Sequence, residues 1–468
     1  METRQIAAII IIVVVVAGVG IGIYYFMPQA PEPPYGELVV AQLVTPGAPA
    51  GVASDHIIKV GILGPLTEIQ GIGHWRGAYM ACDELNTAGG VTIDGEVYYF
   101  GIIAEDTFEA ETSLDPSKGV TAAQRILTTD GAQFTLGGFR TEAVDAYLPT
   151  IMAAKKLFLS CGPATDLFTE YVNESYDTYK YFFKVTPINS TALGGEILHF
   201  LAALKPIMEG ALGKNISQVA IIREDLAWTI PLSGAINAYL GYFGYNKTIE
   251  IAYPIAQSAS SSLFAGYWQQ IDDSGAQITI PIISAQGGIT LTTQYKALEP
   301  GCLIAGIDVQ SQLPNYWNET DGACEHEVQI QTMHRTNKTE RSIAMWDSFL
   351  DLFDGDEPLY TAVGAYDAMY LLHKGINDAQ SLNSTDVIPY LEAITVDNPF
   401  EGVGGNFAYT YTHDVFEGYI GNTIYSVGLF CQWQAGGVKQ VVTTGGAVYP
   451  NWLATAAITF PSWGINDE

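Results

Sequence analysis

The sequence is poor in positive charge. It contains 20 Lys and Arg residues against 50 Asp and Glu residues, which gives a formal net charge of −30. A chain this acidic repels phosphate backbones and anionic lipid headgroups. We therefore expect no nucleic-acid partner, and we interpret the acidity as a means of keeping an exposed protein soluble.

The sequence also lacks the motifs that indicate catalysis or a bound metal. It has no Cys-x-x-Cys and no Gly-x-Ser-x-Gly, and Gly71 and Gly73 are not followed by the third glycine of a dinucleotide fingerprint. The seven histidines are scattered, and the closest candidate pair, His326 and His334, does not have the spacing of zinc ligands. We predict that the protein is not an enzyme and holds no cofactor or metal.

Cysteines are few, and their number is odd. In an oxidising compartment Cys302 and Cys324 could close a local loop, so we predict a disulfide between them. Cys82, Cys161 and Cys431 fall in segments that look buried, and we expect them to be free thiols.

Charged residues are absent from a long apolar run near the N-terminus, Ile6 to Phe26. A run of this length just spans a hydrocarbon core of about 30 Å as a helix, and aromatic residues stand at its exit as they do at membrane interfaces. We interpret residues 1–27 as an uncleaved transmembrane helix, a signal anchor that leaves the remaining chain on the extracytoplasmic side of the cell membrane. The Pro-, Gly- and Ala-rich residues 28–55 are expected to form a semi-extended stalk.

Glycosylation sequons favour the same side of the membrane. Seven asparagines begin Asn-X-Ser/Thr, more than chance predicts for this composition, although loops are rich in these residue types anyway. The predicted glycosylation sites are Asn173, Asn189, Asn215, Asn246, Asn318, Asn337 and Asn383.

Strand and helix patterns alternate from Ile57 onward. Apolar, β-branched runs such as Ile57 to Leu63 alternate with helical periodicity such as that of Arg76 to Asn86, and the same rhythm restarts after Pro187. This alternation is typical of parallel, doubly wound sheets. A second α/β stack, a helix at 361–374 and a strand-rich tail at 407–442 indicate two lobes.

Five stretches resemble one family. They are IKVGILGPLT with RGAYMACDELNTAGGV, LGGFRTEAV, LFLSCGPAT, AVGAYDAMYLL and VGLFCQW. In their order and spacing they resemble the type I periplasmic binding proteins, in particular the leucine/isoleucine/valine-binding substrate-binding proteins of ABC transporters. The resemblance implies an α/β fold of two doubly wound, Rossmann-like lobes joined by a three-segment hinge.

On this resemblance we place the hinge crossings near Thr186-Pro187, near Ile307-Asp308 and near 401–404. Lobe 1 would then comprise residues 56–186 and 309–402, and lobe 2 residues 187–308 and 403–450. Residues 451–468 would form a C-terminal tail.

The resemblance also implies ligand contacts on lobe 1. Thr141 stands where the family places a hydroxyl that holds the ligand carboxylate, and Ala164 and Thr165 would add backbone groups and a second hydroxyl. Arg140 departs from the family pattern: it could clamp a carboxylate or simply pair with Glu142. Thr165 could equally cap the helix that begins near Asp166.

On lobe 2, Trp228 stands where the family has an aromatic residue over the ligand, and Gln286 replaces a family aromatic. Asp308 stands where a family acid binds the ligand ammonium, although it could be an ordinary turn aspartate. Gln70, at the start of the first helix, is a further candidate lining residue.

The resemblance implies a function in transport. We expect an extracytoplasmic solute-binding protein that captures a small, amino-acid-like molecule, an amide or a small organic acid for an ABC permease in the membrane. The alternatives are a sensory ligand-binding ectodomain acting through a partner, and a surface or structural protein that kept the fold but lost the pocket.

Overall fold

The computed structural model describes residues 11–16, 21–26, 34–111, 113–284, 286–442 and 451–467. Parts of the predicted anchor and stalk, residues 1–10, 17–20 and 27–33, lie outside the described residues. The same holds for residues 443–450, which end the predicted second lobe, and for residue 468 of the tail.

The apolar N-terminal run contains two strands where the sequence predicted one transmembrane helix. β1 (Ile11–Val16) and β2 (Ile21–Phe26) pair antiparallel, with Ile11 opposite Phe26. The run is rich in Ile and Val, whose branching at Cβ favours strands over helices. The predicted helix is therefore not found at these residues. Across the part of the chain that the structure describes, no helix is both long and apolar enough to cross a membrane.

Residues from Leu38 onward form a separate compact unit. Its first segment is not the free stalk that the sequence predicted over 28–55. Val44 exchanges backbone hydrogen bonds with Ile102 (2.9 and 3.0 Å), and Ala41 donates to the carbonyl of Ala104 (2.8 Å). Proline and glycine around these residues suggested an extended chain, and the chain is extended, but it lies against a strand.

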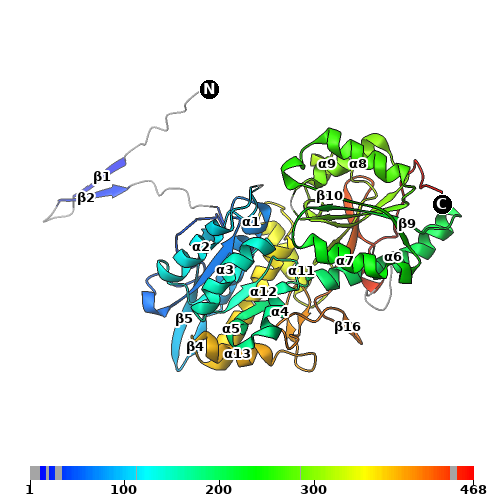
Figure 1. Cartoon of the computed structure of the whole chain (residues 1–468). Coiled ribbons are helices and arrows are strands. Elements are labelled where there is room, and N and C mark those ends of the chain that lie inside the picture. The colour runs from blue at the N-terminus through cyan, green and yellow to red at the C-terminus, as the bar shows by residue number, and fades with distance from the viewer. Residues whose placement is uncertain are drawn as a thin grey trace. The chain divides into compact units, whose positions relative to one another are not determined.

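The first sheet has six strands and lies in lobe 1 (Figure 1). All neighbours are parallel except β4 and β5, which form an antiparallel hairpin. The strands are, in spatial order, β4 (Val91–Ile93), β5 (Glu96–Asp106), β3 (Ile57–Gly64), β6 (Phe134–Gly137), β7 (Phe158–Ser160) and β8 (Phe182–Lys184). The strand order reverses at β3, so the loops after β3 and β6 border the crevice where doubly wound sheets bind ligands.

Helices from two distant parts of the chain complete lobe 1. They are α1 (Ile69–Thr87), α2 (Pro116–Thr128), α3 (Thr141–Ala153), α4 (Leu167–Glu174), α5 (Tyr176–Tyr179), α11 (Ser342–Leu352), α12 (Tyr360–Ala379) and α13 (Ser384–Glu392). Glycines let α1 and α12 approach closely: a Cβ on Gly77 would lie 2.0 Å from the carbonyl oxygen of Ala362. Lobe 1 is thus built from two separate parts of the chain.

The second sheet has seven strands. In spatial order they are β10 (Asn246–Tyr253), β9 (Gln218–Glu224), β11 (Ile278–Ile283), β12 (Leu303–Asp308), β13 (Val328–Gln331), β18 (Leu429–Gln434) and β19 (Val438–Val441). The first five strands are parallel, and β18 and β19 are antiparallel additions. β13 pairs with β12, so the sheet continues past the predicted crossing at Ile307-Asp308, and the chain leaves it after Gln331. Residues 309–331 therefore belong with lobe 2 and not with lobe 1.

Helices of lobe 2 flank this sheet (Figure 1). They are α6 (Ser190–Leu212), α7 (Thr229–Tyr239), α8 (Ser261–Asp273), α9 (Gly288–Leu298) and α10 (Tyr316–Glu319). The C-terminal tail packs on the same lobe, where Asn466 donates to the carbonyl of Gly301 (2.7 Å) and Thr459 to the side chain of Gln432 (2.8 Å). Two short hairpins, β14 (Phe400–Glu401) with β15 (Asn406–Phe407) and β16 (Tyr419–Ile420) with β17 (Thr423–Ile424), lie between α13 and β18.

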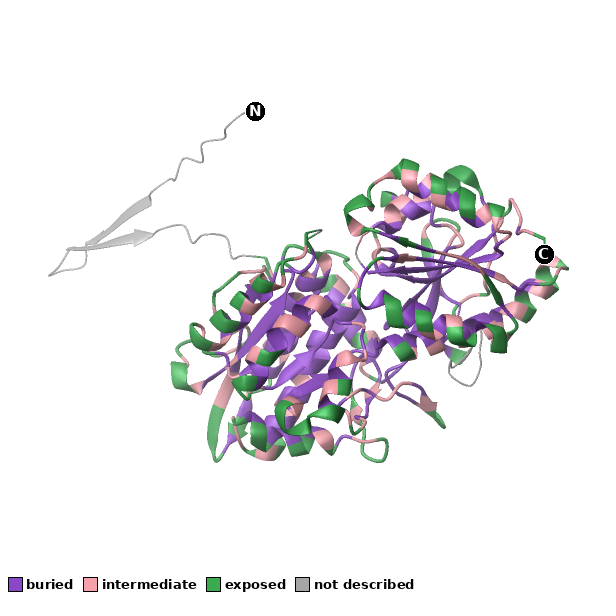
Figure 2. Cartoon of the chain, in the orientation of Figure 1, coloured by how far each residue is buried: buried purple, intermediate pink, exposed green. Residues whose placement is uncertain are grey.

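Both sheets are buried and their helices are exposed on one side (Figure 2). The central strands β3, β6 and β11 are buried at nearly every position, which explains why they read as continuous apolar runs and not as alternating ones. The predicted α/β fold of two doubly wound lobes is confirmed.

The predicted disulfide between Cys302 and Cys324 does not form. All five cysteines are free and buried. Cys302 lies at the start of β12, where its Sγ is 3.2 Å from the hydroxyl of Thr279, whereas Cys324 packs with Tyr316 and Trp433 in a separate cluster. The two thiols occupy different packing sites, so the loop between them is closed by other contacts.

Candidate functional site

A cavity lies between the two lobes, at the carboxyl ends of their strands. The space inside it is about 40 Å³, enough for a few water molecules. The lining residues come from both sheets and from the hinge: Phe139, Gly162, Ala164, Pro187, Ile188, Leu193, Glu196, Trp228, Ser284, Ile307, Val309, Gln312, Ile330, Gln331, Thr332, Tyr360 and Gly428.

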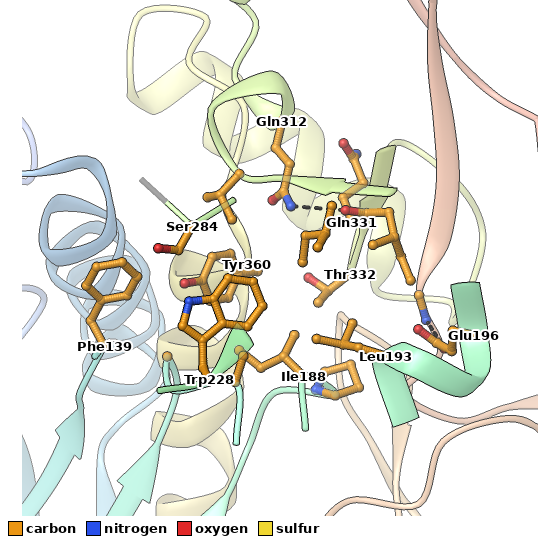
Figure 3. Close-up of a pocket in the computed structure, with 17 residues that line it drawn as sticks. Phe139, Ile188, Leu193, Glu196, Trp228, Ser284, Gln312, Gln331, Thr332 and Tyr360 are labelled. Atoms are coloured by element: carbon orange, nitrogen blue, oxygen red, sulfur yellow. Dashed lines mark hydrogen bonds between the residues drawn. The ribbon is translucent and has the colours of Figure 1, made fainter. Parts of the chain in front are cut away.

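Three aromatic rings dominate the wall nearest to lobe 1. Figure 3 shows Trp228 between Phe139 and Ile188, with Tyr360 beside it. All three rings are buried. Aromatic walls of this kind offer a large apolar contact area to a ligand.

The backbone of two lobe 1 loops forms the floor under Phe139. A Cβ on Gly162 would lie 1.8 Å from the carbonyl oxygen of Gly138, so only glycine permits the loops after β6 and β7 to approach this closely. The close approach places Phe139 and Ala164 side by side on the cavity wall.

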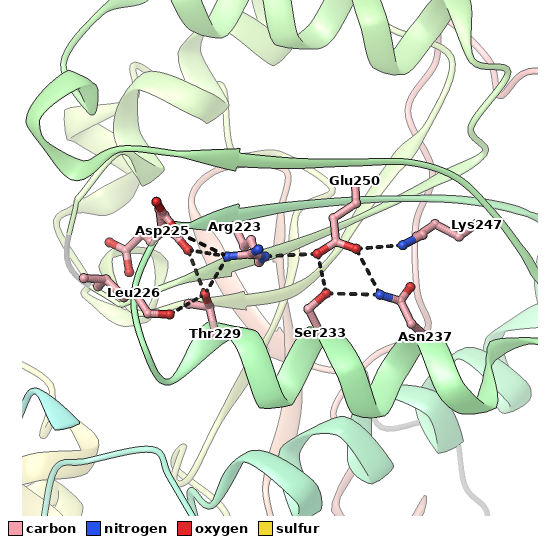
Figure 4. A network of polar contacts seen from close by, with 9 residues as sticks. Arg223, Asp225, Leu226, Thr229, Ser233, Asn237, Lys247 and Glu250 are labelled. Atoms are coloured by element: carbon pink, nitrogen blue, oxygen red, sulfur yellow. Dashed lines mark hydrogen bonds and ion pairs between the residues drawn. The ribbon is translucent and has the colours of Figure 1, made fainter. Parts of the chain in front are cut away.

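A polar network fixes the start of the helix that follows Trp228 (Figure 4). Trp228 immediately precedes α7, whose first residue, Thr229, lies within hydrogen-bond distance of Arg223 Nη1 (3.2 Å) and of the Glu224 carbonyl (2.7 Å). Arg223 in turn donates through Nε to Glu250 (3.0 Å). The start of α7, and with it the tryptophan, is thereby tied to β9 and β10.

Glu250 is the centre of this network. Besides Arg223, it accepts from Lys247 (2.7 Å), Ser233 (2.6 Å) and Asn237 (2.9 Å). Partial burial acts to raise its pKa, but these four donors outweigh burial and lower the pKa to about 2. The carboxylate therefore stays charged, and its role is structural.

Glu196, at the opposite side of the cavity, is satisfied on one side only (Figure 3). Its Oε1 accepts from the backbone N–H of Gly428 (3.0 Å), while its Oε2 is buried and has no hydrogen-bond partner. Burial raises the pKa of this carboxyl to about 7. The hydroxyl of Thr332 and the indole N–H of Trp228 also line the cavity, are buried and lack partners.

The loop after β6 carries an internal anion. The carboxylate of Glu109 accepts from the backbone N–H groups of Phe139 (3.2 Å) and Arg140 (2.8 Å) and from the Thr107 hydroxyl (2.7 Å). Burial raises the pKa of Glu109 to about 7, against the lowering effect of these donors. The chain thus fills the N-terminal end of α3 with a carboxylate of its own.

Arg140 and Thr141 lie next to this carboxylate. The Arg140 guanidinium is 2% exposed and donates through Nη1 to the Glu111 carbonyl (2.9 Å), whereas its Nε and Nη2 have no partner. The Thr141 hydroxyl is also buried without a partner. Burial lowers the pKa of Arg140, and the nearby carboxylates, Glu224 first among them, oppose this shift. No ion pair joins Arg140 to Glu142 within the described ranges.

Hydrogen bonds link the lobes directly across the mouth of the cavity. Gln286 donates to the carbonyl of Ala110 (3.0 Å), Gln70 donates to the carbonyl of Ser284 (3.4 Å), and Glu142 accepts from the backbone of Ala227 (2.9 Å). The two lobes therefore contact one another directly beside the cavity.

A model of the periplasmic binding proteins matches residues 57–417 of the chain. This chain belongs to the periplasmic binding protein family. The family is one of binding proteins and not of enzymes, and the chain is accordingly a binding protein. No curated protein sequence matches it.

Solved structures of this family share the fold at low identity. An ABC transporter substrate-binding protein from Desulfitobacterium hafniense in complex with Leu is 17% identical, with 81% of this chain and 98% of that chain covered and a TM-score of 0.62. The branched-chain amino acid transporter substrate-binding protein of Streptococcus pneumoniae in complex with isoleucine is 16% identical over 82% and 99%, with a TM-score of 0.63. A solute-binding protein from R. palustris in complex with benzoate is 14% identical over 84% and 98%, with a TM-score of 0.65.

Of the eight ligand contacts predicted for this periplasmic binding protein, the structure brings two to the cavity wall, Ala164 and Trp228. Arg140 and Thr141 directly follow Phe139, another wall residue. Gln70 and Gln286 bridge the lobes beside the cavity. The role of all six in ligand binding stays a prediction.

Thr165 has the helix-capping role that the sequence also allowed. Its hydroxyl accepts from the backbone N–H of Leu167 (3.2 Å), the first residue of α4. A side-chain oxygen in this position satisfies an N–H that the helix leaves free. Thr165 does not line the cavity.

Asp308 also lies away from the cavity wall. Its carboxylate accepts from the backbone N–H of Gln310 (2.9 Å) and from the hydroxyl of Tyr316 (3.1 Å). A bond to the N–H two residues on is an Asx turn, which is the turn role that the sequence left open. Burial raises the pKa of Asp308 to about 7. The placement argues against Asp308 as the partner of a ligand ammonium.

Two carboxylates near the site were missed by the sequence reading, Glu109 and Glu196. The only sequence signal for Glu196 is an acid within the apolar run ALGGEILHFL of α6. Glu109 carries no signal at all, because it lies in a polar loop where an acid is ordinary.

The predicted glycosylation sites fall into two groups. Asn189 is buried, and its side chain caps α6 by accepting from Ala192 (2.6 Å) while donating to Asp414 (2.8 Å). The other six are exposed: Asn173, Asn215, Asn246, Asn318, Asn337 and Asn383.

Proposed function

We propose that this protein is an extracytoplasmic solute-binding protein that captures a small, amino-acid-like molecule between its lobes and delivers it to an ABC-type importer. The observation that carries the proposal is the cavity itself: it joins both lobes and the hinge, and it combines aromatic walls with buried polar atoms that lack partners. Buried polar atoms are normally hydrogen-bonded, so the absence of partners for these atoms favours a ligand with polar groups.

The ligand that fits this cavity has an apolar body. Phe139, Trp228 and Tyr360 offer ring faces to it, and Ile188 and Leu193 add aliphatic contacts. The similar proteins named above bind leucine, isoleucine and benzoate, whose bodies are likewise apolar.

An anionic end of the ligand would lie toward Arg140 and Thr141. The guanidinium keeps two nitrogen atoms without partners, and the hydroxyl beside it is also unpartnered. Guanidinium groups bind carboxylates in a two-pronged manner, and a buried guanidinium gains most from such a partner.

The test is a thermal-shift screen of the full-length chain. The screen covers branched-chain and aromatic amino acids, their amides and the corresponding carboxylic acids. A ligand that binds the native state raises the melting temperature in a concentration-dependent way. We expect at least one class of compounds to raise the melting temperature of the unaltered protein. The same compounds are expected not to raise the melting temperature of Trp228→Ala, because this substitution removes the central ring. A flat response across all these classes, and across ω-amino acids and alkylamines as well, would exclude the proposal.

We further propose an extracytoplasmic location, with the apolar run Ile6 to Phe26 attaching the chain to the membrane. The support is the uncharged, apolar composition of the run and the exposure of six sequons. Intact-mass analysis of membrane-extracted protein is expected to find the N-terminal residues retained. Glycopeptide mapping in a glycosylating host is expected to find carbohydrate on exposed sequons and none on Asn189, whose side chain is engaged in the fold.

A further inference from the structure

Among the described residues that line the cavity, Glu196 is the one with an acidic group. It is 3% exposed, and its Oε2 has no hydrogen-bond partner in the part of the chain that the structure describes. A carboxylate has room for about four hydrogen bonds, so a single bond to Gly428 leaves most of its capacity unused. Gly428 also sets the position of the free oxygen, because a Cβ there would lie 2.6 Å from Oε2.

The nearest lysine does not satisfy Glu196. Lys338 is buried in the hinge, and its ammonium donates to the backbone carbonyls of Thr332, Val427 and Gly404. An ammonium has three protons, and these three acceptors use them all. Lys338 therefore contributes an electrostatic attraction but no hydrogen bond, and the described residues give Glu196 no ion pair within 4.0 Å.

The position of Glu196 in the cavity determines what kind of ligand could reach it. Figure 3 shows Glu196 and Phe139 on opposite sides of the cavity, with Trp228 and aliphatic side chains between them. An α-amino acid carries its amino and carboxylate groups on one carbon, so it cannot place one group beside Phe139 and the other at Glu196.

We propose that Glu196 binds an amino group at the hinge end of the ligand, and that an apolar chain or ring separates this amino group from the end that faces lobe 1. The substrate class is then a terminal amine, such as an ω-amino acid, and not an α-amino acid. The hydroxyl of Thr332 is a second acceptor at the same end. This inference rests on the proposed function, because it assumes that the cavity holds a solute.

Calorimetry with four compounds of one carbon skeleton tests the proposal. The compounds are hexylamine, 6-aminohexanoate, norleucine and hexanoate, and the protein is the full-length chain with and without Glu196→Gln. We expect the two terminal amines to bind the unaltered protein more tightly than hexanoate and to lose affinity about tenfold or more in the variant, since a hydrogen bond to a charged group is lost. Hexanoate and norleucine are expected to change little, which shows that the variant still folds and closes.

Asp308→Asn is the matched control. Asp308 is a carboxylate of the same lobe, and burial raises its pKa to about 7, as it does for Glu196, but Asp308 does not line the cavity. Its substitution is expected to leave the affinity for amines unchanged.

Two results would overturn the inference while the proposed function stands: hexanoate or norleucine binds as tightly as the terminal amines, or Asp308→Asn weakens amine binding and Glu196→Gln does not. If neither these compounds nor those of the broader screen bind, the proposed function itself is wrong.

Discussion

Glu109 and Glu196 are two buried glutamates, the first bonded to the backbone of the cavity residue Phe139 and the second on the cavity wall itself, and they differ in the number of their hydrogen-bond partners. Burial raises the pKa of both to about 7. Glu109 has three donors distributed over both oxygens, whereas Glu196 has one donor and a free oxygen. Neither burial nor pKa separates the two residues, but the number of hydrogen-bond partners does.

The number of hydrogen-bond partners of a buried carboxylate indicates whether its role is structural or whether it is available to a ligand. A carboxylate whose capacity is filled by the fold holds loops in place, as Glu109 does for the start of α3. One that keeps an open oxygen in a cavity remains available to a ligand.

The largest difference is expected in folding stability. Glu109→Ala leaves two buried backbone N–H groups and the Thr107 hydroxyl without their acceptor, and each unsatisfied group costs about 1–3 kcal/mol. We expect the free energy of unfolding to fall by about 3 kcal/mol or more. Glu196→Ala leaves only the N–H of Gly428 without an acceptor, and we expect the free energy of unfolding to fall by about 1 kcal/mol. Urea unfolding of both variants measures the two effects, and equal losses would remove the distinction between the residues.

The dependence of stability on pH comes next in size. The pKa values of Glu109, Glu196 and Asp308 are raised to about 7 in the folded protein, above their ordinary values of 4.5, 4.5 and 3.8. The folded state therefore binds more protons than the unfolded state between pH 4 and 7. The resulting stability is present in full below about pH 4 and is lost as the pH rises through about 7. Buried histidines act in the opposite direction: burial lowers the pKa values of His74 and His334 to about 3 and about 4, so the stability that they remove at low pH is regained as the pH rises to about 6.5. We therefore expect the contribution of a carboxyl to show in the difference between the unaltered protein and Glu196→Gln.

Melting temperatures across this pH range check the expectation. In Glu196→Gln the loss of stability with rising pH is expected to be smaller, because one of the titrating carboxyls is gone. An equal change in stability with pH in the two proteins would show that Glu196 is better solvated than its burial indicates.

The smallest effect concerns two hydroxyls that differ in the same way as the two glutamates. Thr165 accepts a hydrogen bond at the start of α4, whereas the Thr141 hydroxyl is unpartnered. Thr165→Val is expected to cost about 1 kcal/mol as a lost helix cap. Thr141→Val exchanges an unsatisfied hydroxyl for a methyl group and is expected to cost less, while it weakens the binding of a ligand with a carboxylate. Thermal denaturation and the ligand screen together distinguish the two roles.

Much of the fold could be predicted from the sequence, because the central strands of both sheets are apolar runs that end in glycine or polar loops. Ile57 to Leu63 was predicted as a strand, and β3 spans Ile57–Gly64. The boundary after Asp308 was misplaced because β13, with the sequence VQIQ, carries two glutamines and lacks the apolar signal of a buried strand. Its glutamines are buried but bonded, since Gln329 donates to the carbonyl of Ser311 (3.2 Å) and Gln331 to that of Met333 (2.6 Å).

The candidate site was predictable only where it depends on strand ends. Trp228 and Ala164 follow strands directly, and the sheet topology brings such residues together. Glu196 lies within a helix that crosses from the hinge, and Glu109 reaches the α3 terminus from another loop. Contacts of this kind depend on how the loops pack in three dimensions, and no spacing in the sequence reports them.

The five buried thiols make the fold independent of an oxidising compartment. Cys82 and Cys161 lie in lobe 1, and Cys302, Cys324 and Cys431 lie in lobe 2, all shielded from solvent. A thiol-reactive label can modify them only when the surrounding core opens. The rate at which each cysteine reacts would therefore report, without any engineered reporter, which lobe opens first as the protein unfolds.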